Sequence, residues 1–293
     1  MIKKLSIVVP IYNDEKSIVP FLNEIEKNLK HIDYELIFCL DPSSDNTESK
    51  LIEEKDKNER IKILKFSRRY GQSLAIREGI FKSSASYVVV IDVDLQDPPK
   101  LIIDMLNKIE KEKIDCVYGQ RLSRKGEFFI RIILVNVYYY ILNKFSLSFF
   151  EIPKNVGEFR IMSRKMVDQL KQTDRGDFLR GDVPFIGFNQ ASIKFNREER
   201  KYGVSKYLIG SVRGAVDGLV NFTHFFSTFA LALVLIFFVL ISFNLFFYIP
   251  TVIISSFGIL SIILLLFFNL IYLRNINDQI KGNSKVIIEK YLE

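Results

Sequence analysis

Cysteine and tryptophan are scarce in this sequence of 293 residues, which contains two cysteines and no tryptophan. Two cysteines, Cys39 and Cys116, exclude a disulfide-stapled scaffold and a zinc site built from cysteine ligands. Both lie in apolar runs, so we expect buried thiols without a chemical role. A Walker loop and a G-x-G-x-x-G pattern after a strand are also missing, which removes the main support for ATP-binding and dinucleotide-binding folds.

Charge is absent from one long stretch. No Asp, Glu, Lys or Arg occurs between Gly218 and Leu273, although charged residues make up 26% of the chain. A membrane helix needs about 20 apolar residues, so we expect two helices near Phe225–Tyr248 and Thr251–Leu273, with a turn at Pro250. The alternative is a buried hairpin in a soluble protein, which would require a larger core.

Both ends of this hairpin should lie on one side of the membrane because the turn is short. Basic residues flank the hairpin, and the positive-inside bias places both flanks in the cytoplasm. These residues are Lys201, Lys206, Arg213, Arg274, Lys281 and Lys285. The first ten residues predict a strand and not a cleavable signal peptide. The sequence thus predicts a multi-pass protein of the inner or plasma membrane, with a cytoplasmic domain (1–217), a membrane hairpin (218–273) and a cytoplasmic tail (274–293).

Short β-branched runs alternate with helical stretches from Leu5 to Gly119, the pattern of a doubly wound α/β layer. Most runs are continuously apolar, as in parallel strands covered on both faces. The expected strands are Leu5–Val9, Glu35–Cys39, Ile61–Phe66, Tyr87–Ile91 and Cys116–Tyr118. The expected helices are Ile18–Leu29, Thr47–Asn58, Gln72–Ser83 and Pro99–Glu112. Ligands of such sheets bind beyond the carboxyl ends of the strands.

Three acids follow the fourth expected strand, in Asp92-Val-Asp94-Leu-Gln96-Asp97. Asp92 and Asp94 would repel each other, so a cation between them would stabilise the pair. Oxygen ligands indicate Mg²⁺ or Mn²⁺, and Gln96 could add a neutral oxygen. Such a metal takes its other ligands from water and substrate phosphates. A bare D-x-D pattern also fits a solvated turn whose acids cap the next helix.

A series of motifs runs along the chain in a fixed order. It comprises Ser6-Ile-Val-Val-Pro10-Ile-Tyr12-Asn13-Asp14-Glu15, Asp41-Pro-Ser-Ser-Asp45-Asn-Thr47, Ser67-Arg-Arg-Tyr-Gly71-Gln72, Asp92-Val-Asp94-Leu-Gln96-Asp97-Pro98, Asn155-Val-Gly157-Glu158-Phe159-Arg160 and Arg200-Lys-Tyr-Gly203-Val-Ser205-Lys206. This series resembles family 2 glycosyltransferases of the GT-A fold. More narrowly, it resembles the polyprenyl-phosphate glycosyltransferases, which include dolichol-phosphate mannosyltransferase and bactoprenol glucosyltransferases. The resemblance spans essentially the whole chain, including the two apolar helices.

The resemblance implies a GT-A (Rossmann-like) nucleotide-sugar domain with a mainly parallel sheet, followed by interfacial helices and a transmembrane hairpin. It implies that Asp92 and Asp94 are catalytic together with Glu158. The residues implied to hold the metal, Mg²⁺ or Mn²⁺, are Asp92, Asp94 and Gln96. The residues implied to bind the nucleotide sugar are Pro10, Tyr12, Asp14, Asp41, Arg121, Arg200 and Lys206. Among these, Asp41 would contact the base, and Arg200 with Lys206 would face the phosphates.

Two positions depart from the family pattern. Leu40 replaces the first acid of the usual Asp-Asp-Gly-Ser, and Glu158 stands where the family usually has Asp, as base or acceptor-positioning group. One extra methylene displaces a carboxylate by roughly 1 Å, which matters for a reacting group. A phosphate acceptor is already an anion near neutral pH, so attack needs positioning more than proton removal. A positioning role therefore tolerates the longer acid better than the role of a base.

Proximity to the membrane indicates a lipid acceptor. Lys206 is close to Gly218 in sequence, so the phosphate-facing site would lie within roughly 20 Å of the bilayer. Two further segments, 126–145 and 206–217, are candidate interfacial helices. For the first, a helix buried against the domain is the alternative.

These features together predict an inverting, metal-dependent transfer from a UDP- or GDP-sugar to polyprenyl phosphate (undecaprenyl or dolichyl), with no nucleic-acid partner. A processive polysaccharide synthase is disfavoured, because such enzymes resemble each other in a Gln-x-x-Arg-Trp segment and this chain has no Trp. A membrane scaffold that binds nucleotide sugars without turnover is a third possibility, motivated by Leu40 and Glu158. A transferase with a non-polyprenyl acceptor also stays open. Small residues in Ser255–Ser261 would permit homo-oligomers through the membrane helices.

Overall fold

A computed structural model describes residues 4–122, 129–146, 150–173, 178–198, 215–216, 218–247, 251–280 and 286–293. The strands are β1 (Leu5–Ile11), β2 (Tyr34–Leu40), β3 (Ile61–Phe66), β4 (Tyr87–Val90), β5 (Cys116–Arg121), β6 (Val156–Ser163), β7 (Gln190–Phe195) and β8 (Ile288–Leu292). The helices are α1 (Glu15–Leu29), α2 (Thr47–Lys57), α3 (Gln72–Lys82), α4 (Leu101–Glu112), α5 (Phe129–Lys144), α6 (Arg164–Gln172), α7 (Leu179–Ile186), α9 (Phe225–Phe247) and α10 (Thr251–Ile280).

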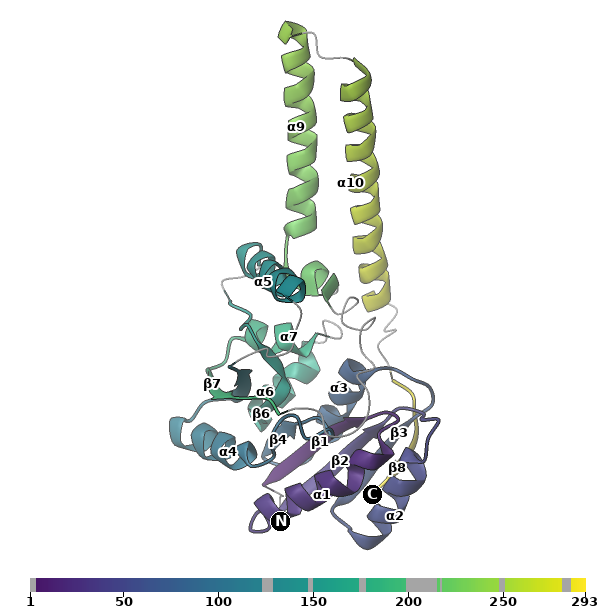
Figure 1. Cartoon of the computed structure of the whole chain (residues 1–293), viewed down its shortest axis with the longest axis vertical. Helices are drawn as coiled ribbons and strands as arrows, with labels where there is room; N and C mark the ends of the chain where they lie inside the picture. The colour runs from purple at the N-terminus through teal and green to yellow at the C-terminus, as the bar shows by residue number, and fades with distance from the viewer. Residues whose placement is uncertain are drawn as a thin grey trace.

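The eight strands form one sheet in the order β7-β5-β6-β4-β1-β2-β3-β8 (Figure 1). Strands β4, β1, β2 and β3 are parallel to one another, and β5 is parallel to β7. All five predicted strands and all four predicted helices are present with slightly shifted ends, which confirms the α/β fold. Two antiparallel strands were not predicted: β6 lies between β4 and β5, and β8 covers the outer edge of β3.

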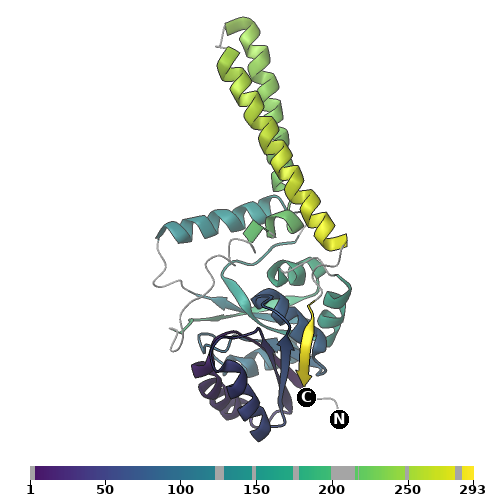
Figure 2. The same cartoon turned by 90° about the vertical axis from the view of Figure 1, so that its right-hand side faces the viewer.

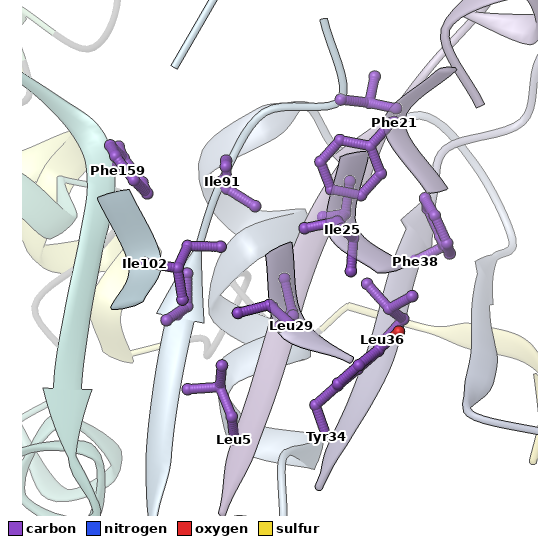
Figure 3. Close-up of a cluster of buried hydrophobic side chains, with 14 of the residues drawn as sticks. Leu5, Phe21, Ile25, Leu29, Tyr34, Leu36, Phe38, Ile91, Ile102 and Phe159 are labelled. Atoms are coloured by element: carbon purple, nitrogen blue, oxygen red, sulfur yellow. The ribbon is translucent and has the colours of Figure 1, made fainter. Parts of the chain in front are cut away.

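Alternate residues of the central strands point to opposite faces of the sheet, and each face is covered by helices. On one face, Leu5 and Phe38 pack with Phe21 and Ile25 of α1 and with Ile102 of α4 (Figure 3). The other face packs against α3, α6 and α7. Each fully buried Leu or Phe contributes about 1.5–3 kcal/mol relative to an exposed one. Burial of both faces explains why the strand sequences are continuously apolar.

Both cysteines lie in the second of these clusters. Cys39 and Cys116 are fully buried. Burial raises the pKa of the Cys116 thiol to about 12 and raises that of Cys39 as well. Neither thiol is ionised near neutral pH, so the prediction of chemically inert core thiols is confirmed.

Helices α9 and α10 lie side by side and project away from the α/β domain (Figures 1 and 2). Each contains a window long and apolar enough to cross a membrane, and only 6% of the window in α9 and 11% of that in α10 is buried. This exposure contradicts the alternative of a hairpin buried in a soluble core. A side chain at Gly258 would collide with the ring of Phe237 across the hairpin. Gly258 therefore allows α10 to pack closely against α9 within the hairpin.

Helix α5 lies across the foot of this hairpin in both views (Figures 1 and 2). Its Tyr139 and Leu142 are buried against Phe222, which precedes α9. Its Leu134 and Tyr140 are 63% and 61% exposed. The helix therefore combines the two alternatives considered for 126–145, one side packed on the domain and one apolar side open. Residues 123–128, and 206–217 apart from 215 and 216, lie outside the described residues.

The segment expected as a tail, 274–293, contains regular structure. Helix α10 continues to Ile280, and Ile288–Leu292 pairs with β3 as strand β8. Val286, Ile288 and Tyr291 give this short segment apolar side chains that pack on the helix-covered core. Strand β3, which carries Lys62 and Lys65, is therefore the second strand from this edge of the sheet.

Candidate active site

The loops that follow β1 and β2 are joined by hydrogen bonds at the carboxyl edge of the sheet. Asn13 has a left-handed backbone with φ of 50°. Its N–H donates to Ser43 Oγ at 3.0 Å, and its side-chain Oδ1 accepts from the Ser44 N–H at 2.7 Å. The Asp14 N–H donates to Thr47 Oγ1 at 2.8 Å. These contacts fix the relative position of two predicted ligand-binding loops.

Asp41 joins the loop that follows β2 to the loop that follows β3. Its side chain is buried, and its two oxygens accept the N–H groups of Tyr70 and Gly71, each at 2.9 Å. Burial raises the pKa of Asp41, and these hydrogen bonds only partly oppose the rise. On the same side, the guanidinium of Arg69 lies 4.0 Å from the centre of the Tyr12 ring. Asp41 thus orders the start of the Tyr70-Gly71 turn, and its predicted contact with the base stays a prediction.

Of the other predicted nucleotide-binding residues, Pro10 is buried within β1, whereas Tyr12 and Asp14 are partly exposed in the loop that follows. Arg200 and Lys206 lie outside the described residues.

The acids Asp92 and Asp94 lie in the turn just beyond β4. The Gln72 side-chain amide donates to Asp92 Oδ1 at 2.7 Å, and the Gln96 N–H donates to Asp94 Oδ1 at 3.1 Å. Burial, and then the charges of Asp94 and Asp97, raise the pKa of Asp92 to about 7. Such crowding of carboxylates in a partly buried turn favours the binding of a cation.

Asp92 and Asp94 suit a divalent cation that completes its coordination with water and phosphate oxygens. Within the described ranges, no group of three or more His, Cys, Asp or Glu side chains could hold a metal alone. A two-carboxylate site therefore fits the chain better than an all-protein site. The Gln96 side chain donates its amide N–H to the Glu198 carbonyl at 3.2 Å. Gln96 thus links the acidic turn to the segment after β7, and its role as a ligand stays a prediction.

Two arginines face these acids. Arg121, the last residue of β5, lies with Nη2 3.8 Å from Asp97 Oδ1, and Arg197 Nε lies 3.4 Å from the same oxygen. Arg197 also approaches Asp92 Oδ2 to 4.0 Å. A side chain at Gly157 would reach within 2.5 Å of the Arg121 guanidinium, so the glycine leaves room for it. The predicted Arg121 and the acids are thereby brought into one cluster of charges.

Glu158 on β6 lies in a second group of charges next to this cluster. Arg180 of α7 donates to Glu158 Oε1 at 2.7 Å, and Arg160 lies 3.7 Å from Oε2. Burial raises the pKa of Glu158, but the positive charges of Arg180 and Arg160 outweigh it, so the pKa lies below its ordinary value. Tyr139 of α5 interacts electrostatically with Arg180, and although burial lowers the pKa of this guanidinium, Glu158 and Tyr139 together raise it above its ordinary value. Glu158 is therefore an anion connected to the helix at the foot of the hairpin.

Three residues that sequence reasoning did not assign to the site belong to these clusters, namely Gln72, Arg180 and Arg197. Arg197 has a signal in the sequence, because it stands three residues before Arg200 in the same basic segment. Arg180 has none, because its partner Glu158 is 22 residues away in the chain. Leu95, which lies between Asp94 and Asp97 in sequence, has a left-handed φ of 59°. A branched residue in this conformation stores strain of the kind found at functional turns.

Comparison with known families and relatives agrees with this architecture. Residues 6–171 match the model of "Glycosyl transferase family 2". An uncharacterized glycosyltransferase of Bacillus subtilis, YkcC, is 37% identical over 227 residues, which cover 75% of this chain and 68% of the relative. A bactoprenol glucosyl transferase of Shigella phage SfV is 31% identical over 226 residues, covering 76% of this chain and 73% of the relative.

Solved structures share the fold at lower identity. A mannosyltransferase from Pyrobaculum calidifontis in complex with GDP-Man and Mn²⁺ has a TM-score of 0.50 and 16% identity, covering 78% of this chain and 64% of that longer one. Glucosyl-3-phosphoglycerate synthase from Mycobacterium tuberculosis, with Mn²⁺ and UDP-Glc bound, has a TM-score of 0.51 and 18% identity, covering 75% of this chain and 79% of that one. The chain is therefore a glycosyltransferase of the GT-A fold. It belongs to glycosyl transferase family 2.

Proposed function

We propose that this glycosyltransferase moves a sugar from a UDP- or GDP-sugar to a polyprenyl phosphate, with inversion at the anomeric carbon. One observation carries the proposal: the charged site is connected to the apolar hairpin by named contacts. Arg180 donates to Glu158 and interacts electrostatically with Tyr139 of α5. Phe145, just after α5, packs on Phe225 at the start of α9 with ring centres 5.3 Å apart. The acceptor class also follows the bactoprenol glucosyl transferase relatives.

On the donor side, Asp92 and Asp94 would hold Mg²⁺ or Mn²⁺ together with the donor phosphates. When bound, the ion would stabilise the charge that develops on the departing nucleoside diphosphate. Arg121 and Arg197 supply further positive charge beside the same acids. When a diphosphate enters, each arginine can exchange its carboxylate partner for a phosphate oxygen, because arginine binds both groups with similar geometry. The acids therefore hold both arginines at the expected position of the leaving diphosphate before the donor binds.

On the acceptor side, Glu158 acts by position and not as a base. A general base works best with a pKa near the operating pH, whereas the pKa of Glu158 is lowered by its arginines. An acceptor phosphate is already ionised, so its oxygen attacks the anomeric carbon while the bond to the diphosphate breaks. Glu158 holds the Arg180 guanidinium in place, and that guanidinium orients the acceptor phosphate. This assignment explains why Glu functions where the family usually has Asp.

Helices α9 and α10 cross the membrane in this proposal, with the α/β domain and both flanks of the hairpin in the cytoplasm. The basic residues on either side of the hairpin support this orientation. The open apolar side of α5, with Leu134 and Tyr140, lies in the membrane interface. A lipid-linked phosphate would then reach the domain without leaving the bilayer.

The test is transfer by the full chain in nanodiscs, with labelled UDP- and GDP-sugars, undecaprenyl phosphate and Mn²⁺ or Mg²⁺. We expect a lipid-phosphate-sugar product that disappears with Asp94→Ala. Asp104→Ala, on the exposed first turn of α4, is the matched control. Full activity of Asp94→Ala would contradict the metal role. Transfer to a soluble phosphate acceptor, with none to the lipid, would contradict the acceptor class.

A further inference from the structure

The chain returns to the α/β domain after the hairpin. Helix α10 ends at Ile280, and strand β8 pairs antiparallel with β3 only a few residues later. The pairing places Leu292 opposite Ile63 and Ile288 opposite Phe66. Side chains add ion pairs, since Lys65 lies 3.3 Å from Glu289. Strand β3, which leads into the loop Ser67–Gly71, thus holds residues 288–292.

Contacts continue past the end of this ladder into the loop itself. The Ser67 N–H donates to the Ile287 carbonyl at 3.0 Å. The Ile287 N–H donates to the Tyr70 hydroxyl, also at 3.0 Å. The Ile287 side chain is 63% exposed, so this residue contributes mainly through its backbone. Two hydrogen bonds therefore fix both ends of the short segment from Ser67 to Tyr70.

The opposite side of the same loop binds the acids of the donor site. The Tyr70 and Gly71 N–H groups donate to Asp41, and Gln72, the next residue, donates to Asp92. The segment Ser67–Gln72, which comprises the loop after β3 and the first residue of α3, is thus bonded to Ile287 on one side. On the other side it is bonded to the acids that follow β2 and β4. A shift of Tyr70 would move the partners of both acids.

We propose that residues 286–293 are a positioning element of the donor site, and that Tyr70 is the residue through which they act. The Ile287 N–H holds the Tyr70 hydroxyl, so that Tyr70, Gly71 and Gln72 keep Asp41 and Asp92 in place for the nucleotide. Because this segment follows α10 closely in sequence, it also connects the hairpin to the donor site. The inference rests on the proposed function and adds residues to its donor site.

A purely structural role makes a different prediction. Strand β8 also covers the edge of β3, and unpaired edges are a liability that proteins cover. If edge protection were the whole role, loss of one hydrogen bond beyond the ladder would lower stability without changing nucleotide affinity. The Michaelis constant for the donor would then be unchanged as well.

Four variants of the full chain in nanodiscs separate these roles. Ile287→Pro removes the N–H that binds Tyr70 and also fixes φ and replaces the side chain, whereas Ile287→Ala keeps this N–H and controls for loss of the exposed side chain. Tyr70→Phe removes the accepting hydroxyl, and Tyr291→Phe in β8 is its matched control. Calorimetry gives the affinities for UDP and GDP with Mn²⁺. Steady-state kinetics give the donor KM and kcat, and hydrogen exchange reports the amides of Tyr70 and Gly71.

We expect Ile287→Pro and Tyr70→Phe each to weaken nucleotide binding about two- to tenfold, the scale of one hydrogen bond. The donor KM rises by the same factor, kcat is unchanged, and the Tyr70 and Gly71 amides exchange faster. The double variant should be no worse than Tyr70→Phe alone, since Tyr70→Phe already removes the acceptor of the Ile287 N–H. Ile287→Ala and Tyr291→Phe should match the wild type.

Faster exchange with unchanged nucleotide affinity, or additive effects in the double variant, would overturn the inference and leave the proposed function intact. Absence of UDP and GDP binding by the wild-type chain would overturn the proposed function and the inference together.

Discussion

Polar side chains are held differently in the two halves of the α/β domain. Around β1 to β4, Asn13 and Asp41 bind mainly backbone N–H groups of neighbouring loops. Around β5 to β7, Arg121, Glu158 and Arg180 bind other charged side chains. Backbone groups are fixed by the fold, whereas an arginine can exchange a carboxylate for a phosphate. The polar contacts of the first half are therefore fixed by the fold, whereas the charged side chains of the second half can change partners.

Strand β6 explains where the second half differs. It runs antiparallel between β4 and β5, so Glu158 near its start faces the end of β5, where Arg121 lies. The antiparallel insertion thus brings Glu158 to the edge of the sheet that carries Asp92 and Asp94. A purely parallel sheet would place the start of such a strand at the opposite edge.

The largest expected effect comes from the acids between the two halves. Asp92→Asn keeps the shape of the side chain and its contact with Gln72 but removes the charge available to a metal. We expect transfer to fall about a hundredfold or more, the scale of losing one preorganised transition-state contact. Binding of UDP or GDP should lose its dependence on Mn²⁺, measured by calorimetry with and without a chelator. Asp104→Asn is the control, and metal-dependent binding by Asp92→Asn would contradict the site.

The next effect distinguishes positioning from base catalysis at Glu158. With Glu158→Gln, the charge that holds Arg180 is lost, so the acceptor KM should rise about tenfold to a hundredfold, the scale of a hydrogen bond to a charged group. The donor KM should change little. Because the pKa of Glu158 is lowered, the group is ionised throughout neutral pH. We therefore expect no inflection from Glu158 in the kcat profile between about pH 6 and 8.

A kcat that collapses in Glu158→Gln with an unchanged acceptor KM would instead identify Glu158 as a base. A wild-type inflection in that pH range that vanishes in the variant would have the same meaning.

How far the sequence predicts these two halves follows from the kind of contact in each. Strands β1 to β5 were predictable because their apolar runs are local, and the D-x-D acids were predictable because Asp92 and Asp94 are only two residues apart in sequence. Strand β6 was not, because Glu158 and Arg160 interrupt its apolar residues. The partners of Asp41 and of Glu158 also depend on tertiary structure, since the amides of Tyr70 and Gly71 are 29 and 30 residues away from Asp41.

A stability comparison of two glycines probes the contrast in packing. A side chain at Gly79 would meet Cys39 and Val8 in the core, whereas one at Gly157 would meet the flexible end of Arg121. Gly79→Ala should therefore lower the free energy of unfolding by about 1–3 kcal/mol. Gly157→Ala should displace the guanidinium and raise the donor KM while the melting temperature stays near that of the wild type. Equal melting temperatures for both variants would contradict the contrast.

The smallest effect concerns the link between the charged half and the hairpin. Tyr139→Phe keeps the ring buried against Leu142 and Phe222 but removes the hydroxyl, the polar group of Tyr139 that can interact with Arg180. Arg180 keeps its bond to Glu158, so the acceptor KM should rise only about two- to tenfold, the range of one hydrogen bond. Donor KM and melting temperature should be unchanged. Tyr140→Phe, whose side chain is 61% exposed on the same helix, is the matched control.

Tyr139 is buried and Tyr140 is exposed on the same helix, so a change in acceptor KM confined to Tyr139→Phe, with an unchanged melting temperature, reports the interaction with Arg180. A rise in acceptor KM with Tyr139→Phe that also appears with a soluble phosphate acceptor would place the effect at the phosphate. A rise seen only with the lipid acceptor would place it at the membrane surface of α5. Equal behaviour of both tyrosine variants would contradict the coupling and leave Arg180 positioned by Glu158 alone.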